Sequence, residues 1–189
     1  MTSYLLAGAV EEPVSLAAMK AHLRVEDEAE DGLIETLISA ARVHVESLSG
    51  RALLDQTWRL TLDAWPEDRI VPLPVSPVTA LSEIRAYDAG GTVHQIDVAQ
   101  FLLDGRANPA RIIVPAVIAG MPVLRARRGI EIDYTAGYGE AEDVPADLSQ
   151  AVRMLAAFWY ENRDLATGEM RAVPGTIGRM VSAYRRVRL

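Results

Sequence analysis

The clearest pattern in the chain is a helical stripe of apolar residues that follows two glycines and a proline. Gly137 and Gly139 interrupt a strand that ends near Tyr134. Pro145 stands where the first turn of a helix tolerates a residue without an N–H group. Polar side chains fall opposite the stripe, which predicts a central scaffold helix with one buried face. The core positions assigned to this helix are Leu148, Val152, Leu155 and Trp159.

Two more helices are predicted before residue 55. Ser15 is a typical N-cap residue and predicts a short helix over SLAAMKAHL. A second helix is expected to start near Asp31 and to end before Gly50, since glycine commonly follows the last residue of a helix. The apolar stripe of this second helix is expected at Leu33, Leu37, Ala41 and Leu48, with Ile34, Ile38 and Val45 beside it. Its polar side is expected at Glu35, Ser39, Arg42 and Glu46. Residues 1–14 are expected to form an extended arm.

From Gln56 the apolar residues recur with a period of two, as in half-buried strands. The segments TWRLTLDAW and IEIDYTAGY are the first and last strands of this region. Residues 80–97 are expected to form a hairpin with its turn at 88–91. The three prolines of VPLPVSPV indicate an edge or a connector. Further short strands are expected at 101–103 and 111–114.

These elements predict an α+β protein, with a small helical bundle and a β-rich insertion between the second and third helices. Residues 1–55 are the N-terminal helical part, and residues 56–136 are the insertion. Residues 137–189 contain the central helix, a short helix from about Pro174 and a basic tail. We expect residues 137–189 to pack with residues 1–55 as one domain.

Composition narrows the classes of function. The 189 residues are 50% hydrophobic and 24% charged, as in an ordinary globular protein. The net charge of −7 argues against a general nucleic-acid binder, which needs Lys and Arg against phosphates. The absence of cysteine excludes disulfides and thiolate metal sites. No apolar run is long enough to cross a membrane, and the N-terminal residues lack the basic region of a signal peptide.

The sequence offers no convincing catalytic, cofactor or metal site. It has no nucleophile elbow, phosphate loop or metalloprotease motif. His44 projects into an apolar stripe and is expected to be a core or interface residue, since neither His22 nor His94 stands at metal-site spacing. The acidic run that begins at Glu26 lacks the glycine-turned spacing of a calcium loop. We therefore expect no cofactor, no metal and no enzyme activity.

Two segments resemble the head–tail connector, or adaptor, proteins of long-tailed phages. They are PVSLAAMKAHLRVEDEAEDGLIETLISAARVHVESLSGRAL and YTAGYGEAEDVPADLSQAVRMLAAFWYENRD. The placement of the insertion and the closing YRRVRL add to the likeness. The chain is most similar to the larger adaptors of prophages and gene transfer agents, which carry a β-rich insertion, and above all to a gene transfer agent adaptor.

The resemblance implies structural work at the head–tail junction of a virion or gene transfer agent particle, with assembly in the host cytoplasm. Such adaptors form a ring, usually of twelve copies, beneath the portal protein and above tail-side connector or stopper proteins. DNA passes through the channel of the ring without sequence-specific binding, and no membrane is involved. In this family the C-terminal segment engages the portal. In this chain the corresponding residues are Arg185, Arg186, Arg188 and Leu189.

An acidic wall would suit a DNA channel, because a basic wall would hold the passing strand electrostatically. Two acidic segments are therefore candidates for the lumen of the ring. Their residues are Glu26, Asp27, Glu28, Glu30, Asp31, Glu140, Glu142 and Asp143.

Two other classes of function stay open on the sequence alone. One is a small soluble enzyme that uses acidic side chains, for which Asp143 and Asp147 are a candidate pair. Such pairs arise by chance in a chain with 26 acids, and helix capping explains these two better. The other is an acidic module that binds another protein.

Overall fold

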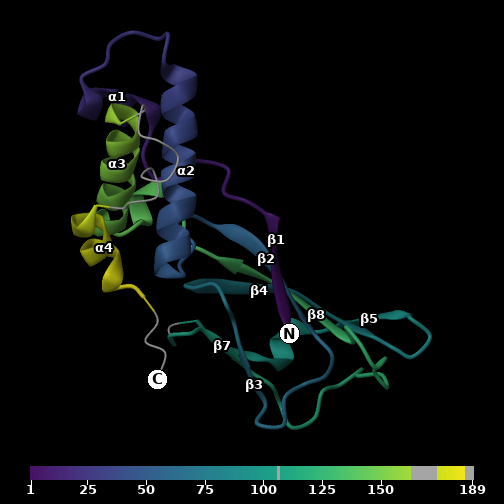
Figure 1. The fold of residues 1–189 in the computed structure, drawn as a ribbon. Helices are drawn as coiled ribbons and strands as arrows, with labels where there is room; N and C mark the ends of the chain where they lie inside the picture. The colour runs from purple at the N-terminus through teal and green to yellow at the C-terminus, as the bar shows by residue number, and fades with distance from the viewer. Residues whose placement is uncertain (106, 163–173, 186–189) are drawn as a thin grey trace. The chain divides into compact units, whose positions relative to one another are not determined.

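The computed structural model describes residues 1–105, 107–162 and 174–185. The chain divides into two compact units. Met1–Ala9 and Asp55–Tyr138 form a unit of strands, while Val10–Leu54 and Gly139–Leu189 form a unit of helices (Figure 1). The predicted α+β class is confirmed, with helices from both ends of the chain and the strand-rich part between the second and third helices.

The helical unit contains α1 (Leu16–Leu23), α2 (Asp31–Ser49), α3 (Ala146–Glu161) and α4 (Gly175–Ser182). The two longest helices, α2 and α3, pack against each other, and α1 and α4 each contact both. The predicted caps are present: the Ser15 side chain accepts a hydrogen bond from the Ala18 N–H, and Gly50 follows α2 with a φ of 68°. Sequence and local geometry therefore agree at these two ends.

One face of α3 forms the centre of this unit. Leu148, Val152 and Leu155 are fully buried, together with Ala151. Trp159, the last residue of the predicted stripe, is half-buried and meets the ring of His44 edge-on at 5.8 Å. The apolar spacing of α3 thus corresponds to its packing up to the last turn.

The buried face of α2 is rotated from the predicted stripe by about one residue. Its buried apolar residues are Ile34, Ile38, Ala41 and Val45. Leu33 is 39% exposed, and Leu37 and Leu48 are half-buried. Leu33, Leu37 and Leu48 lie beside Ile34, Ile38 and Val45 around the helix axis, so two neighbouring stripes fit the helical period. Packing against α3 and α4 selects the one that contains Ile34 and Ile38.

The strand unit contains two antiparallel sheets. The larger has the order β1 (Thr2–Ala7), β2 (Gln56–Leu62), β8 (Ile130–Ala136), β4 (Val78–Tyr87) and β5 (Val93–Ile96). The smaller has the order β3 (Ile70–Pro72), β7 (Arg111–Ile113) and β6 (Leu102–Asp104). Short 3₁₀ turns lie at Val98–Gln100 in this unit and at Ala141–Asp143 in the helical unit.

Most strands agree with the period-two pattern, and the first part of the expected extended arm at residues 1–14 is itself a paired strand. The hairpin of β4 and β5 is confirmed, with the Gly91 N–H donating to the Asp88 carbonyl in its turn. Residues 2–7 form β1, which pairs with β2 at the edge of the larger sheet. Residues 1–9 therefore belong with the strands, whereas the sequence placed them in the helical part.

The central strand of the larger sheet, β8, has two faces of opposite character. Ile130, Ile132 and Tyr134 are fully buried on one face. On the other, Glu131 and Asp133 lie opposite residues of β2 and β4, the strands on either side. Because neighbouring side chains alternate in a strand, this single sequence both fills the core and supplies charge to the second face.

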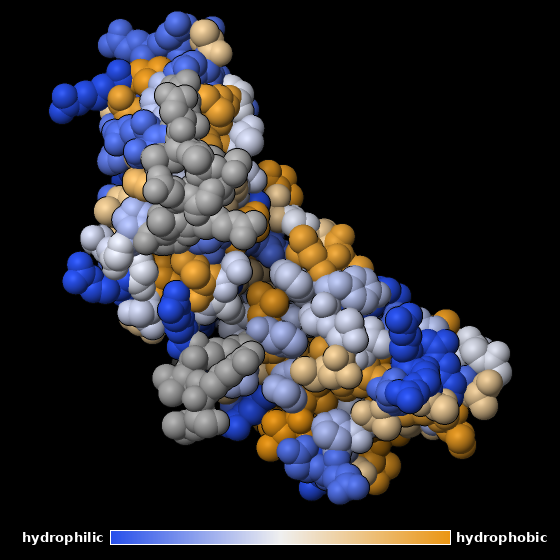
Figure 2. Space-filling view, in the orientation of Figure 1, coloured by the Kyte–Doolittle hydropathy of each residue, from blue (hydrophilic) through white to orange (hydrophobic). Residues whose placement is uncertain are grey.

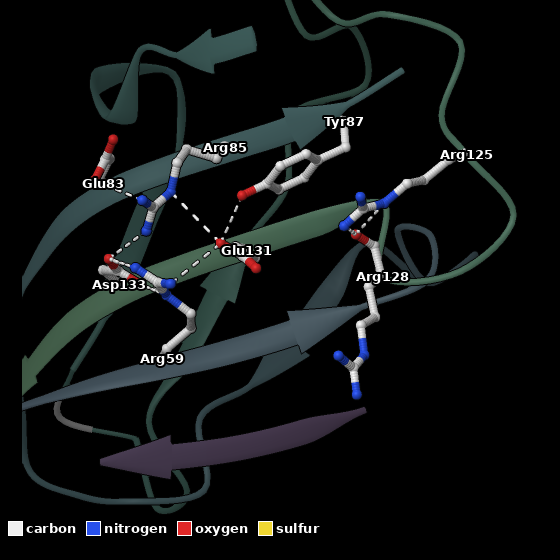
Figure 3. A network of polar contacts seen from close by, with 8 residues as sticks. All are labelled: Arg59, Glu83, Arg85, Tyr87, Arg125, Arg128, Glu131 and Asp133. Carbon is white, nitrogen blue, oxygen red and sulfur yellow. Dashed lines mark hydrogen bonds and ion pairs between the residues drawn. The ribbon is translucent and has the colours of Figure 1, made fainter. Parts of the chain in front are cut away.

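That second face carries a network of ion pairs (Figure 3). Arg59 of β2 binds Asp133 through two hydrogen bonds of 2.7 and 2.8 Å, and Arg85 of β4 donates to the same carboxylate at 2.6 Å. Glu131 lies 3.4 Å from the Arg59 guanidinium and 3.7 Å from that of Arg85. The hydrogen bonds to Asp133 are the main reason that the pKa of Arg59 is raised.

The network continues along β4 to Tyr87. Its hydroxyl donates to Glu131 at 2.9 Å, and the Arg125 guanidinium lies 4.1 Å from the centre of its ring. Burial and the hydrogen bond to Glu131 raise the pKa of the Tyr87 hydroxyl. At neutral pH the tyrosine therefore stays neutral and serves as a hydrogen-bond donor.

Replacing Asp133 by Asn should destabilise the strand unit. The side chain of Asp133 is 9% exposed, and its loss leaves the two partly buried arginines with longer contacts to Glu131, and Arg85 also with Glu83 at 3.6 Å. We expect a loss of about 2–4 kcal/mol in the free energy of unfolding, measured by urea denaturation. The matched control is Asp63→Asn, at an exposed ion pair with Arg127, and should change the midpoint far less. Equal effects of the two substitutions would contradict this account.

Candidate functional site

The candidate sites in this chain are surface segments of the helical unit and its C-terminal end. Within the ranges that the structure describes, no group of three or more His, Asp or Glu side chains is placed to hold a metal ion. The same ranges contain no helix that is both long and apolar enough to cross a membrane. The two acidic segments and the arginine tail are therefore considered in turn.

The first acidic segment connects α1 to α2. Glu26, Asp27 and Glu28 are exposed, and the Asp27 carboxylate accepts a hydrogen bond from the Ala29 N–H at 2.9 Å. The last two acids of the segment are tied down, because Asp31 pairs with Lys20 at 2.6 Å and Glu30 accepts a hydrogen bond from the Tyr160 hydroxyl. The exposed charge of this segment is thus concentrated at residues 26–28.

The second acidic segment precedes α3. Glu140, Glu142 and Asp143 are exposed, but Asp143 has a structural role because its carboxylate accepts the Glu140 N–H at 3.3 Å. Gly139 makes this turn possible: its φ is 114°, and a Cβ there would lie 2.7 Å from an Asp143 carboxylate oxygen. Glu11 accepts the next N–H, that of Ala141, at 3.1 Å.

This geometry accounts for Asp143 without acid–base chemistry. Asp143 caps the 3₁₀ turn, and Asp147 is exposed in the first turn of α3, where a negative charge suits the helix dipole. Both members of the candidate carboxylate pair therefore have local structural explanations.

A charged cluster that the sequence pattern did not reveal holds the helical unit together. Arg42 of α2 lies between Glu12, at 2.7 Å, and Glu46, at 3.0 Å. Burial opposes the charge on Arg42, but the bonds and charges of the two acids outweigh it and raise the pKa of the guanidinium. Glu46 also accepts the Leu53 N–H at 2.9 Å. These contacts fasten the segments before α1 and after α2 to the middle of α2.

The beginning of the C-terminal tail is fixed at the C-terminal end of α2. The Arg185 guanidinium donates to the Leu48 carbonyl at 3.0 Å, and Arg51 donates to the Tyr184 carbonyl at 3.3 Å. A cation at a helix C-terminus meets carbonyl groups that have no partner within the helix. Arg186, Arg188 and Leu189 lie outside the described residues.

The three histidines have separate environments. His44 meets Trp159 edge-on, His22 is exposed on α1, and His94 lies 3.1 Å from Asp88 in the hairpin. The hydrogen bond from His94, followed by that from the Thr92 N–H, lowers the pKa of Asp88. Each histidine is thus associated with a different element.

Comparisons with known proteins fit this picture of a structural component. The chain is 29% identical to a chain from the neck of an empty gene transfer agent particle, computed with C6 symmetry, with a TM-score of 0.82. It is 28% identical to chains of the native gene transfer agent virion and of the native neck computed with C12 symmetry, both with TM-scores of 0.80. In each case the match covers 100% of this chain and 97% of the other.

No curated protein gives a significant match. The model of the head completion protein family matches residues 14–187, which include helices α1 to α4 and strands β2 to β8. This match and the likeness to neck chains confirm the predicted resemblance to adaptors, and with it a structural role at the head–tail junction. The chain belongs to the head completion protein family.

Proposed function

We propose that this chain is one subunit of an adaptor ring in a gene transfer agent or related phage-like particle. In this proposal the ring lies beneath the portal protein, joins it to tail-side connector or stopper proteins and leaves an axial channel for DNA. The observation that carries the proposal is the full-length likeness to neck chains reconstructed with C6 and C12 symmetry. Twelve copies would satisfy both symmetries.

The physical character of the chain supports this role. A ring requires heterologous contacts, in which two different faces of one subunit meet. Internal ion pairs hold both the larger sheet and the helical unit, so each unit can keep its shape while its outer faces meet neighbours. A net charge of −7 also avoids a strong general attraction to the phosphates of passing DNA.

The tail is proposed to dock on the portal. Arginine forks bind carboxylates with two parallel hydrogen bonds, which suits a terminal segment that must find one site on another protein. The Arg185 contact with Leu48 gives the tail a fixed starting point on the helical unit. The remaining tail residues can then make the intermolecular contacts.

Deleting residues 186–189 should abolish attachment to the portal without lowering the thermal stability of the chain. Arg185 keeps its bond to Leu48 in this variant, so the end of the helical unit is preserved. Attachment is measured by co-purification with the portal protein. The control is Arg127→Gln, which removes an arginine whose side chain is 87% exposed in the strand unit. Unchanged attachment after the deletion would refute portal docking by the tail.

The acidic residues are proposed to line the channel, with 26–28 as the main exposed group. Neutralising Glu26, Asp27 and Glu28 to the corresponding amides should slow DNA release from particles several-fold, because the wall then repels phosphates less. The difference should shrink as salt is added. A second variant, with Glu140 and Glu142 neutralised, tests the other acidic segment separately.

The control for these variants is the neutralised pair Glu67 and Asp68, two exposed acids of the strand unit. Release is measured by the fluorescence of a DNA-binding dye as particles are triggered to open. If neither acidic segment alters release or its salt dependence relative to the control, the channel assignment is wrong, although the adaptor role would stand.

A further inference from the structure

The edge strand β1 lacks the charges and the proline that often protect edge strands, although its pairing with β2 is irregular between Leu5 and Ala7. One side of β1 pairs with β2, and among the residues that the structure describes no backbone group pairs with the other side. Its sequence, TSYLLA, contains no charge and no proline. Tyr4, Leu5 and Leu6 are 43%, 47% and 42% exposed. A bare apolar edge of this kind readily accepts another strand.

The opposite edge of the same sheet is similar. The sequence of β5 is VHQI, with Val93 51% exposed and His94 paired with Asp88. Throughout the described ranges, β4 is the one strand that pairs with β5. Neither edge strand of the larger sheet therefore contains an Asp, Glu, Lys or Arg residue.

The smaller sheet shows the usual protection. Its edge strand β3 ends at Pro72, which has no N–H to offer, and its other edge strand β6 ends at Asp104, which pairs with Arg111. The two sheets belong to the same unit of one chain. A low overall content of charged residues therefore does not explain why the edges of the larger sheet lack both charge and proline, whereas each edge of the smaller sheet has one or the other. Figure 2 shows orange hydrophobic residues among white and pale blue ones around the position of β1 in Figure 1.

We propose that β1 of one copy of this chain pairs with β5 of the neighbouring copy, so that the larger sheets join edge to edge around the ring. This inference rests on the proposed ring of identical subunits. A heterologous contact needs two different surfaces that fit each other. The two outer edges of the larger sheet are such a pair: β1 presents Tyr4, Leu5 and Leu6, and β5 presents Val93. Within the part of the chain that the structure describes, the outer side of each strand has no backbone partner.

Strand direction distinguishes this contact from a two-fold dimer. Four successive antiparallel pairings separate β1 from β5, so the two edge strands run in the same direction. Rotation about a ring axis keeps that direction, and β5 of the next copy would therefore pair with β1 in parallel. A two-fold dimer would instead bring two β1 strands together in antiparallel fashion.

Cysteine cross-linking in assembled particles tests this pairing directly. The chain contains no cysteine, so the introduced residues supply its only thiols. Tyr4→Cys and Val93→Cys are combined in one chain, because Tyr4 lies opposite Arg59 and Val93 opposite Tyr87, on the face of the sheet that carries the ion pairs. The particles are treated with a short bismaleimide, which tolerates a small error in register. We expect a ladder of cross-linked copies of the chain from the double variant. Either single variant should give none.

Each other outcome has a defined meaning. Cross-linked dimers from Tyr4→Cys alone would show a two-fold β1 contact and overturn the proposal. No ladder from the double variant, in particles that contain the chain, would overturn edge pairing while leaving the adaptor role intact. Particles that lack the chain altogether would refute the proposed function and this inference with it.

Two controls separate edge pairing from general effects. Leu102→Cys combined with Val93→Cys should give no ladder, since Leu102 is 65% exposed on an edge of the smaller sheet. If the Tyr4→Cys variant does not fold, as judged by thermal unfolding, Thr2→Cys with Gln95→Cys replaces the pair, at two exposed positions on the same strands and the same face. Replacing Leu5 and Leu6 by Lys should reduce incorporation into particles, while Leu102→Lys should not.

Discussion

Two carboxylates on the central strand of the larger sheet, Glu131 and Asp133, face two arginines that come from the strands on either side. Charges that are removed from water must be paired, and here the pairing is possible only if β2, β8 and β4 lie in their observed register. A shift by one residue would turn Ile132 towards the charged face and Asp133 towards the core. The ion pairs and the apolar face of β8 therefore specify the same arrangement.

The helical unit follows a similar principle with different elements. The apolar face of α3 supplies most of the contact with α2, and Arg42 fixes the flanking segments through Glu12 and Glu46. Both units thus have an apolar core and an arginine cluster that joins segments distant in sequence. For a protein whose work is to hold other proteins in place, stable units with specified register are more useful than a reactive pocket.

Local signals explain which parts of the fold could be predicted from sequence. The α3 stripe, the Ser15 cap, Gly50 and the β4–β5 hairpin each depend on a few neighbouring residues, and all are present. The rotation of α2 could not be predicted, because two adjacent stripes fit its sequence and only packing chooses between them. The strand β1 was missed because both of its faces are largely exposed, so it lacks the alternation of a half-buried strand.

The contacts between distant segments explain what remained hidden at the candidate sites. Nothing near Arg59 indicates a partner 74 residues away, and Arg42 gives no sign of pairing with Glu12, 30 residues before it. The acidic segments were visible as composition, but the roles of Glu30, Asp31 and Asp143 in local contacts were not.

The central claim is that this chain is a structural subunit of the particle neck, present in multiple copies. A cryo-electron microscopy reconstruction of the neck of particles produced from the genome that encodes this chain tests this claim most directly. If the chain has this role, the reconstruction will show a closed ring of this chain between portal and tail. A neck that is fully occupied by other proteins, with no density for this chain, would contradict it.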